Sequence, residues 1–286
     1  MSTLNRLQIK FKSFNVIEQI IVLNVGVFIL SALFGALKGD VWLIRYLELP
    51  RDVFDLIYQP WSILTYGFVH YDFFHLLFNM LVLHYIARIL FNLFQKRLIL
   101  NIYLLGIIFG GMAYLLVYNL FDDSYLKSVG VLVGASAGVR ALLIFLCVYL
   151  PDNEVRILSF NIKLLYIALV MIGFDFLGLV GANQGGNIAH LGGALLGYLY
   201  AVQFKNGKDL GSGFNKFVSG IVSVFKTKSP LKTVHKRASK SSVTKSSEFS
   251  ELNKQKQIDL ILDKISKSGY ESLTKEEKEF LFRAGK

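Results

Sequence analysis

Proline, tryptophan, cysteine and acidic residues are scarce in this chain of 286 residues, which has four Pro, two Trp, one Cys and 20 Asp or Glu. The lone cysteine, Cys147, excludes an intramolecular disulfide and a Cys-based metal cluster. Charged residues make up only 18% of the chain, whereas 53% of its residues are hydrophobic and 24 are Phe. A composition this apolar is untypical of a soluble globular domain. The sequence therefore predicts a membrane protein.

Six apolar runs are each close to the roughly 20 residues that a helix needs to cross a hydrocarbon core about 30 Å thick. They cover residues 16–37, 73–94, 98–121, 129–150, 161–181 and 187–204. The first run follows basic residues, as a cleavable signal peptide would, but its apolar stretch is too long for one. The sequence shows no internal repeat of the kind that builds many transporters. We expect an all-α membrane protein with a six-transmembrane-helix bundle.

The positive charge of the chain is concentrated in its tail. The formal net charge is +11, and residues 205–286 hold 18 Lys or Arg against 9 Asp or Glu. The segments 95–97 and 156–163 are also basic, whereas the other loops are mixed or neutral. By the positive-inside rule, both termini are expected in the cytoplasm. The basic tail is then expected to lie near anionic lipids, and nucleic acid is not an expected partner.

The sequence as a whole predicts four consecutive parts of the chain. Residues 1–15 form a cytoplasmic lead, and 16–205 form the six-helix domain, whose first loop over 38–72 mixes aromatic and charged residues and suits the water–lipid boundary. Residues 206–250 predict a basic amphipathic helix, over about 214–225, and a flexible Lys/Ser/Thr-rich linker. Residues 251–286 predict a small helical hairpin, with Gly269 ending one helix and Thr274 to Glu277 forming a capping box.

Polar residues near the ends of the apolar runs carry the functional information, because a charged group at mid-membrane costs about 2.5–3.5 kcal/mol on insertion scales. His70, His75 and Asn79 stand at the start of the second run, and the four-residue spacing of His75 and Asn79 places them on one helix face. Taken alone, each residue is as compatible with a structural role as with a functional one: the histidine could simply be solvated at the interface, and the asparagine could link two helices.

Two further groups combine small residues with a reactive one. Ser136 lies in Gly134-Ala-Ser136-Ala-Gly138, which matches the nucleophile elbow of soluble hydrolases, but that elbow needs a preceding strand that we do not expect within 129–150. Small residues alone would also permit close helix contact. His190, Gly193 and Gly197 fall at helical spacing in one stripe, on which another backbone can approach the imidazole.

The three groups are expected at a similar depth near the outer face. A hydroxyl, a neutral base and a set of hydrogen-bond donors at one depth are the parts that acyl transfer requires. The combination of these groups favours a nucleophile at Ser136 over three independent structural roles.

The joint pattern of His70, His75, Asn79, Gly134-Ala-Ser136 and His190-x-x-Gly193-x-x-x-Gly197 resembles the rhomboid protease family over roughly residues 16–205. The resemblance implies an intramembrane serine endopeptidase that cleaves transmembrane protein substrates, with its active site opening to the outer side of the cell (inner) membrane. It implies Ser136 as nucleophile and His190 as base, and an oxyanion hole made by His75, Asn79 and the Ser136 backbone N–H. His70 would lie beside the cavity, and no cofactor or metal is implied.

Two positions depart from the family pattern. Ala137 replaces the glycine that usually follows the serine, which leaves the backbone N–H in place. Arg140 stands four residues after the serine, where the family generally has an aromatic or apolar side chain against the histidine. An intramembrane Arg needs a partner, and we expect it to pair with Asp175 of the fifth run. Asp175 is less favoured as a third catalytic-triad member, because one carboxylate cannot readily serve both roles.

Two alternatives remain open at this point. A catalytically inactive rhomboid-like protein that binds or escorts transmembrane clients would account for Arg140, although such relatives usually lack the serine or the histidine. A transporter or channel would use the intramembrane polar residues as a pathway, but the lack of repeats and of several acidic residues at mid-depth disfavours it.

Overall fold

The computed structural model describes residues 3–38, 42–121, 130–157, 159–181, 183–225 and 258–284. The chain divides into two compact units, Met1–Lys226 and Thr227–Lys286. The elements of the first unit are, in chain order, α1 (Thr3–Ser13), α2 (Val16–Lys38), α3 (Trp42–Arg45), α4 (Val53–Tyr58), α5 (Ser62–Thr65), η1 (Tyr66–Phe68), α6 (Phe73–Leu93), α7 (Lys96–Leu120), α8 (Ser136–Tyr149), β1 (Glu154–Ile157), β2 (Phe160–Lys163), α9 (Leu164–Gly178), α10 (Gln184–Lys205) and α11 (Gly211–Phe225).

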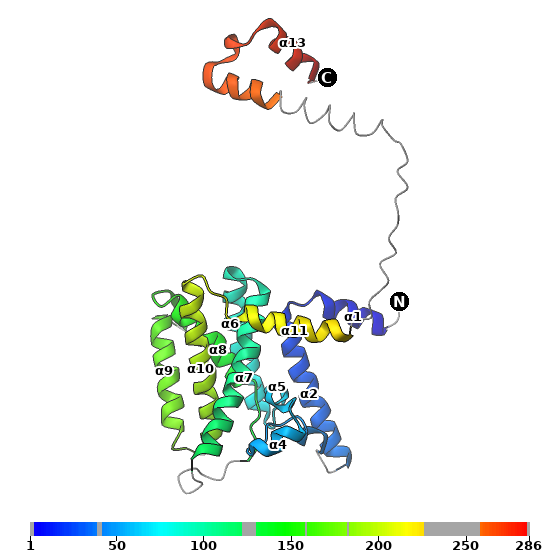
Figure 1. The fold of residues 1–286 in the computed structure, drawn as a ribbon, viewed down its shortest axis with the longest axis vertical. Coiled ribbons are helices and arrows are strands. Elements are labelled where there is room, and N and C mark those ends of the chain that lie inside the picture. Colours follow the sequence, from blue (N-terminus) through cyan, green and yellow to red (C-terminus); the bar gives the residue numbers. More distant parts are fainter. Residues whose placement is uncertain are drawn as a thin grey trace. The chain divides into compact units, whose positions relative to one another are not determined.

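Helices α2, α6, α7, α8, α9 and α10 form one bundle (Figure 1). By length and composition, three helices in the described part of the chain could each cross a membrane: α2 over Val16–Ala36, α6 and α7. Helices α8 and α9 are apolar but have only 14 and 15 residues. The chain is thus a mostly helical protein with three clear candidate spans, and the count of six spans stays a prediction.

The segment before α8 corrects one predicted boundary. We expected a helix over 129–150, but α8 begins only at Ser136. Leu132 instead pairs with Leu49 in an isolated antiparallel β-bridge, and Gly134 has a φ of +115°, which an α-helix does not accommodate. The prediction was wrong here because a short apolar run such as 131–133 has no periodicity that separates strand from helix.

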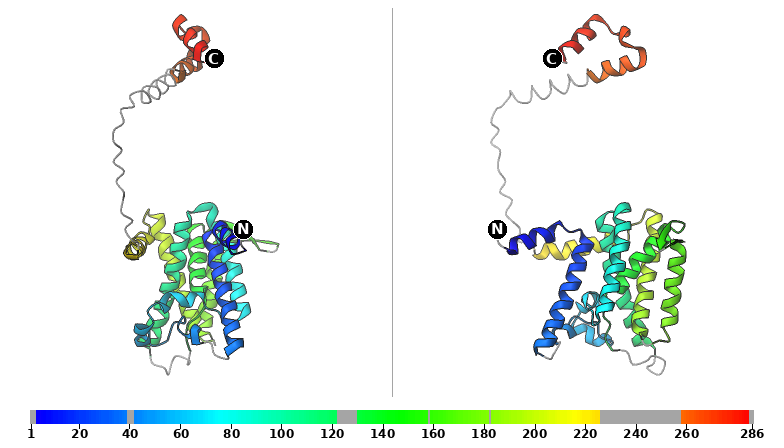
Figure 2. Two further views of the ribbon diagram at one scale, coloured as in Figure 1. Left: turned by 90° about the vertical axis from the view of Figure 1, so that its right-hand side faces the viewer. Right: turned by 180° about the vertical axis from the view of Figure 1, so that it is seen from behind.

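A short β-hairpin between α8 and α9 corrects a second boundary. We expected the fifth helix over 161–181, but β1 and β2 pair antiparallel through residues 154–157 and 160–163, and α9 begins at Leu164. Alternation of apolar and polar residues in both strands favours this pairing. The hairpin lies at the end of the bundle that carries α1 and α11 (Figure 2).

The two ends of the bundle differ in structure. Helices α1 and α11 lie across one end, whereas α4 and α5 lie at the other (Figure 1). Helix α11 contains the amphipathic helix that we expected over 214–225. At the opposite end, the indole N–H of Trp61 donates to the Tyr46 carbonyl, and the Thr65 hydroxyl donates to the Leu47 carbonyl. These two hydrogen bonds hold α5 against the residues that directly follow α3.

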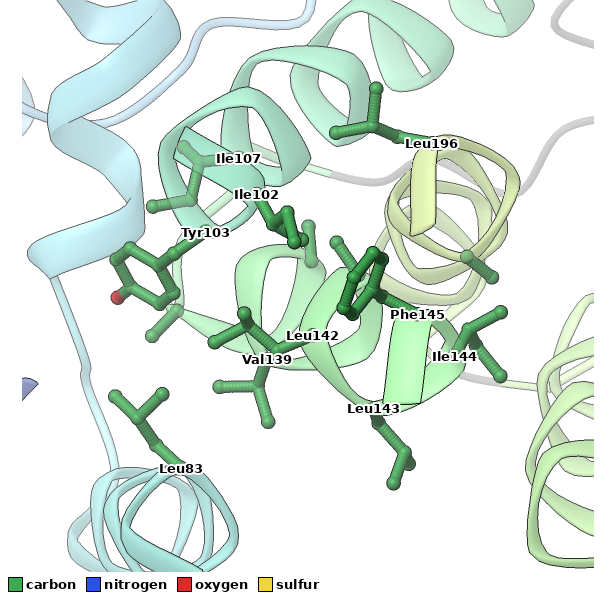
Figure 3. Close-up of a cluster of buried hydrophobic side chains, with 14 of the residues drawn as sticks. Leu83, Ile102, Tyr103, Ile107, Val139, Leu142, Leu143, Ile144, Phe145 and Leu196 are labelled. Atoms are coloured by element: carbon green, nitrogen blue, oxygen red, sulfur yellow. The ribbon is translucent and has the colours of Figure 1, made fainter. Parts of the chain in front are cut away.

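Helix α8 occupies the centre of the bundle. Ten of its 14 residues are buried. In Figure 3, Val139, Leu142 and Phe145 of this helix face side chains from its neighbours, which include Leu83 of α6 and Leu196 of α10. Because α8 is surrounded by protein, its length need not match the thickness of a bilayer.

Glycines allow the backbones of α8 and α10 to touch. A Cβ atom at Gly193 would lie 2.2 Å from the Ala137 carbonyl oxygen, and one at Gly197 would lie 2.3 Å from the Ala141 carbonyl oxygen. Such distances exclude any side chain at either glycine. The stripe of His190, Gly193 and Gly197 therefore lies against another helix at backbone distance, as the spacing predicts.

In its described part, residues 258–284, the second unit has two helical segments, over residues 258–268 and in α13 (Lys275–Ala284), with a 3₁₀ turn, η2 (Tyr270–Ser272), between them. Gly269 has a φ of +76° directly after the first segment. The predicted capping box is present, because Glu277 N–H donates to Thr274 Oγ1 and Thr274 N–H donates to the Glu277 carboxylate. Lys264 Nζ lies 2.8 Å from Glu277 Oε2 and links the two segments. The predicted linker 227–250 lies outside the described residues.

The contact between α8 and α10 predicts an asymmetry between two glycine substitutions. Gly197→Ala places a methyl group against the Ala141 carbonyl and should lower the free energy of unfolding by about 1–3 kcal/mol. Gly26→Ala in α2, where a Cβ meets nothing within 4 Å, should be neutral or slightly stabilising. Thermal unfolding in detergent measures both, and equal melting temperatures would contradict the packing described here.

Candidate active site

The chain reaches Ser136 through an extended segment and a tight turn. Leu132 and Leu49 exchange both backbone hydrogen bonds, at 2.9 and 3.1 Å. Gly134 then turns the chain with its positive φ, and its N–H donates to the Tyr66 carbonyl over 3.0 Å. Ser136 is the first residue of α8. The serine is thus fixed from both sides, by a β-bridge before it and by a buried helix after it.

This arrangement corrects our reading of Gly134-Ala-Ser136-Ala-Gly138. We did not expect a strand before the serine, yet the structure has an extended β-bridge, a turn and then a helix. The order resembles the strand–turn–helix setting of a nucleophile elbow, although a single bridge takes the place of a full strand. Gly134 is required for a second reason, because a Cβ there would lie 2.7 Å from His75 Cε1.

Ser136 and His190 are in hydrogen-bond contact although 54 positions separate them in sequence. Ser136 Oγ lies 2.8 Å from His190 Nε2. His190 comes from α10 and Ser136 from α8, so the contact depends on the close approach of these two helices. A hydroxyl beside an imidazole nitrogen at this distance can pass its proton to the ring.

The other ring nitrogen of His190 contacts Asp175, on α9. His190 Nδ1 lies 2.9 Å from Asp175 Oδ1, and Arg140 Nη2 donates to the same oxygen over 2.8 Å. The expected pairing of Arg140 with Asp175 is therefore confirmed. We expected one carboxylate not to serve both Arg140 and His190 readily. In the structure Asp175 Oδ1 contacts both side chains, as the two lone pairs of a carboxylate oxygen allow.

His75 and Asn79 contribute side chains from α6 to the same cavity as Ser136 and His190. Asp72 caps this helix, since its carboxylate accepts the His75 backbone N–H over 2.8 Å. Asn79 Nδ2 donates to the His75 carbonyl over 2.9 Å, which uses one of its two N–H groups. The predicted shared face of His75 and Asn79 thus borders Ser136.

His70 holds the turn that precedes the serine. Its Nε2 accepts the Ala135 backbone N–H over 3.3 Å, and its ring lies 5.0 Å from that of His75, centroid to centroid. Burial, together with the nearby His75 ring, lowers the pKa of His70 to about 3. The neutral imidazole is the form that can accept this hydrogen bond. The family resemblance predicted His70 beside the cavity, but residue spacing does not predict its hydrogen bond to Ala135.

Two cavities meet at the serine. The larger, of about 370 Å³, is lined by residues of α6, α8, α9 and α10 and by Asn183, which precedes α10. The helix residues are His75, Phe78, Asn79, Val82, Ser136, Val139, Arg140, Leu143, Met171 and His190. The smaller, of about 260 Å³, is lined by Tyr71, Asp72, His75, Val131, Leu132, Val133, Ser136, Asn183 and Gly186. Ser136, His75 and Asn183 border both cavities. The serine hydroxyl can therefore be approached from two directions.

Asn183 was not among the predicted site residues. It precedes α10 and lines both cavities. The only available signal was its place in a polar loop before the helix that carries His190. Tyr71, which lines the smaller cavity, donates its hydroxyl to the carboxylate of the buried Glu48. No group of three or more His, Cys, Asp or Glu in the described ranges is arranged to hold a metal ion.

Comparison with protein families finds the Rhomboid domain over residues 58–206, which is just over half of the chain. A second family, described as a family of unknown function (DUF6576), matches residues 250–284. Among curated proteins, RHOMBOID-like protein 12, mitochondrial, of Arabidopsis thaliana is 24% identical over an alignment of 206 residues that covers 68% of this chain. The match covers 60% of that relative, so the chain spans less than two thirds of its length.

The environment of His70 predicts a pH-dependent stability. Its pKa is about 3 in the folded chain and 6.5 when unperturbed. Folding therefore favours the neutral form of His70. The contribution of this residue to the free energy of unfolding is complete above pH 6.5 and is lost as the pH falls from there toward 3. From about pH 7 to about pH 4 the wild type should lose more free energy of unfolding than His70→Gln. His84→Gln, at an exposed position of α6, should behave like the wild type. Equal losses in all three chains, measured by denaturation in detergent, would contradict this role.

Proposed function

Because the chain belongs to the rhomboid family, matched over residues 58–206, we propose that it is an intramembrane serine endopeptidase that cleaves transmembrane segments of client proteins. The observation that carries the proposal is the 2.8 Å contact between Ser136 Oγ and His190 Nε2. The protease domain would cover residues 16–205, with residues 206–250 and 251–286 as the amphipathic helix with linker and the small hairpin.

The proposed reaction begins with attack of Ser136 Oγ on the carbonyl carbon of a peptide bond. The serine proton passes to His190 Nε2 as the new C–O bond forms. When the tetrahedral intermediate collapses, the C–N bond breaks and the protonated imidazole gives its proton to the leaving amine. A water molecule, deprotonated by the same nitrogen, then releases the acyl group and restores Ser136.

Hydrogen-bond donors are available where the negative charge of the intermediate would develop. Ser136 is the first residue of α8, and the first N–H groups of a helix have no acceptor within it. His75 and the remaining N–H of Asn79 border the same cavity. These three donors would form the oxyanion hole.

The two cavities suit two different reactants. The wall of the larger cavity is mainly apolar, with Phe78 and Val82 from α6, Leu143 from α8 and Met171 from α9. We propose that the client segment enters there, between α6 and α9. The smaller cavity has Tyr71, Asp72 and Asn183 on its wall and would supply water. A client must unwind to expose its scissile carbonyl, which favours Gly, Ala or other weak helix features at that site.

The short length of α8 would place the serine within the membrane. Fourteen residues extend about 21 Å, some 9 Å less than the hydrocarbon core. If the inner end of α8 is level with its neighbours, Ser136 lies below the outer headgroups, and the extended segment 130–135 connects it to the surface.

The charges at the α1 and α11 end support a cytoplasmic position for both termini. Helix α1, which contains Lys10 and Lys12, lies at this end, as does the β-hairpin, which contains Arg156 (Figures 1 and 2). By the positive-inside rule this end faces the cytoplasm, and the site opens to the outer side of the cell membrane. Phe11 of α1 and Phe217 of α11 are exposed and would enter the lipid interface. The basic residues of these two helices would then lie near anionic headgroups.

The alternative, an inactive rhomboid-like protein that binds or escorts clients, rests mainly on Arg140. In the structure this side chain is engaged by Asp175 and does not separate Ser136 from His190. The contact between nucleophile and base therefore favours the protease.

Substitution of either proposed catalytic residue should abolish cleavage. Ser136→Ala removes the nucleophile and His190→Ala removes the base, so each should lower the turnover of a single-span substrate in proteoliposomes by at least about 1,000-fold. Ser31→Ala and His84→Ala, at positions in α2 and α6 that do not line the cavities, should keep wild-type turnover. Persistent cleavage by either of the first two variants would end the assignment.

Entry through the larger cavity predicts a selective effect on substrate binding. Met171→Trp narrows this cavity and should raise the KM for a single-span substrate by about 10-fold, with little effect on the reaction of Ser136 with a small fluorophosphonate. Val170→Trp is the matched control, because Val170 is 51% exposed and does not line the cavity. Equal effects of both substitutions on KM would argue against this route.

A further inference from the structure

One buried carboxylate oxygen connects three helices at the site. Asp175 Oδ1, on α9, lies 2.9 Å from His190 Nδ1 and 2.8 Å from Arg140 Nη2. The Asp175 side chain is only 2% exposed, against 15% for Arg140 and 16% for His190. The opposite nitrogen of the same imidazole contacts Ser136 Oγ. Hydroxyl, imidazole, carboxylate and guanidinium thus form one continuous chain of contacts.

We propose that Asp175 is a positioning residue that completes a Ser136–His190–Asp175 triad, and that Arg140 in turn holds Asp175 in place. The inference rests on the proposed protease function and deepens it. It differs from a two-residue mechanism because the orientation and tautomer of the base are set by a third helix, α9.

The carboxylate fixes the tautomer of His190. A carboxylate held against a guanidinium is only an acceptor, so the proton on the imidazole must lie on Nδ1 and point at Asp175. Nε2 then presents its lone pair to the Ser136 hydroxyl. When the serine proton moves to Nε2, the ring becomes an imidazolium, and the adjacent carboxylate stabilises its charge without taking a proton.

The geometry of the Arg140 pair supports positioning over simple charge neutralisation. An Arg–carboxylate pair usually adopts a bidentate fork, in which both oxygens are engaged. Here both His190 and Arg140 contact Oδ1, while Asp175 Oδ2 and Arg140 Nε are buried and have no hydrogen-bond partner in the described part of the chain. The carboxylate therefore gives up the stronger fork with Arg140 and keeps its contact with the histidine.

Arg140 is well placed to hold this carboxylate. It lies one turn after Ser136 on α8, on the same face as the serine. A buried carboxylate without a partner is strongly destabilising. The Arg140 guanidinium supplies that partner from α8, the helix that carries Ser136. The ion pair thus links α9 to α8 beside the proposed catalytic residues.

The competing explanation is that Asp175 only neutralises Arg140. Two variants separate these roles: Asp175→Asn, and the double substitution Asp175→Asn with Arg140→Gln, which removes both charges. If Asp175 serves only as a counterion, the double substitution should restore activity. If Asp175 orients His190, the double substitution should remain as slow as Asp175→Asn.

Two readouts are measured on the full-length chain in detergent or proteoliposomes: the rate at which a fluorophosphonate labels the serine, and kcat and KM for a single-span substrate. Asp175→Asn should lower the labelling rate and kcat by at least about 100-fold and change KM by less than about threefold. The double variant should show the same loss. Asp175→Glu, which retains the carboxylate, should recover part of the rate.

Several results would overturn the inference. Recovery of the double variant to within about threefold of wild type would leave Asp175 as a counterion only. Wild-type labelling of Asp175→Asn, or a change confined to KM, would also exclude positioning. Melting temperatures identify variants that lose rate by misfolding, and the double variant keeps the test valid if Asp175→Asn alone is unstable. A wild type whose serine neither labels nor cleaves would instead overturn the proposed function, and the inference with it.

Discussion

The contact between the backbones of α8 and α10 is the constraint on which the site depends. Gly193 and Gly197 face the carbonyl oxygens of Ala137 and Ala141 at distances that exclude a side chain. Hydrophobic burial gives little drive for helix association in a membrane, so close packing of small residues takes its place. This approach brings His190 to Ser136, and the Ser136–His190 contact is a direct consequence of it. The chemistry and the packing of the bundle are therefore specified by the same stripe of residues.

A second feature joins the site to α9. Arg140 and Asp175 are charged groups of a kind that membrane helices rarely contain, and each satisfies the other. The Asp175 carboxylate also contacts His190. The ion pair that compensates the charge of Arg140 can therefore also orient the base, His190. The other side of the site is held by hydrogen bonds from backbone N–H groups: His70 accepts the Ala135 N–H, and the Asp72 carboxylate accepts the His75 N–H at the start of α6. The serine, the base and the donors of the proposed oxyanion hole are thus supported from separate elements.

Much of this arrangement could be predicted from residue spacing. The positions of α2, α6, α7 and α10 follow from long apolar runs, and the Arg140–Asp175 pair follows from the need to compensate two buried charges. The β-bridge at Leu132 and the hairpin β1–β2 could not be predicted, because short apolar runs read as helix or strand and their partners lie far along the chain. The shared use of Asp175 Oδ1 and the position of Asn183 depend on how three helices meet, which spacing within any one of them does not determine.

Ser136, His190 and the donors around them are proposed to act together as one acyl-transfer site. The decisive measurement is an experimental structure of the chain after reaction with a peptidyl phosphonate. We predict a covalent bond from phosphorus to Ser136 Oγ, the His190 ring between that oxygen and Asp175, and the phosphonyl oxygen directed at the Ser136 N–H and the His75 side chain. A phosphonate attached to another residue, or an imidazole turned away from both Ser136 and Asp175, would contradict it.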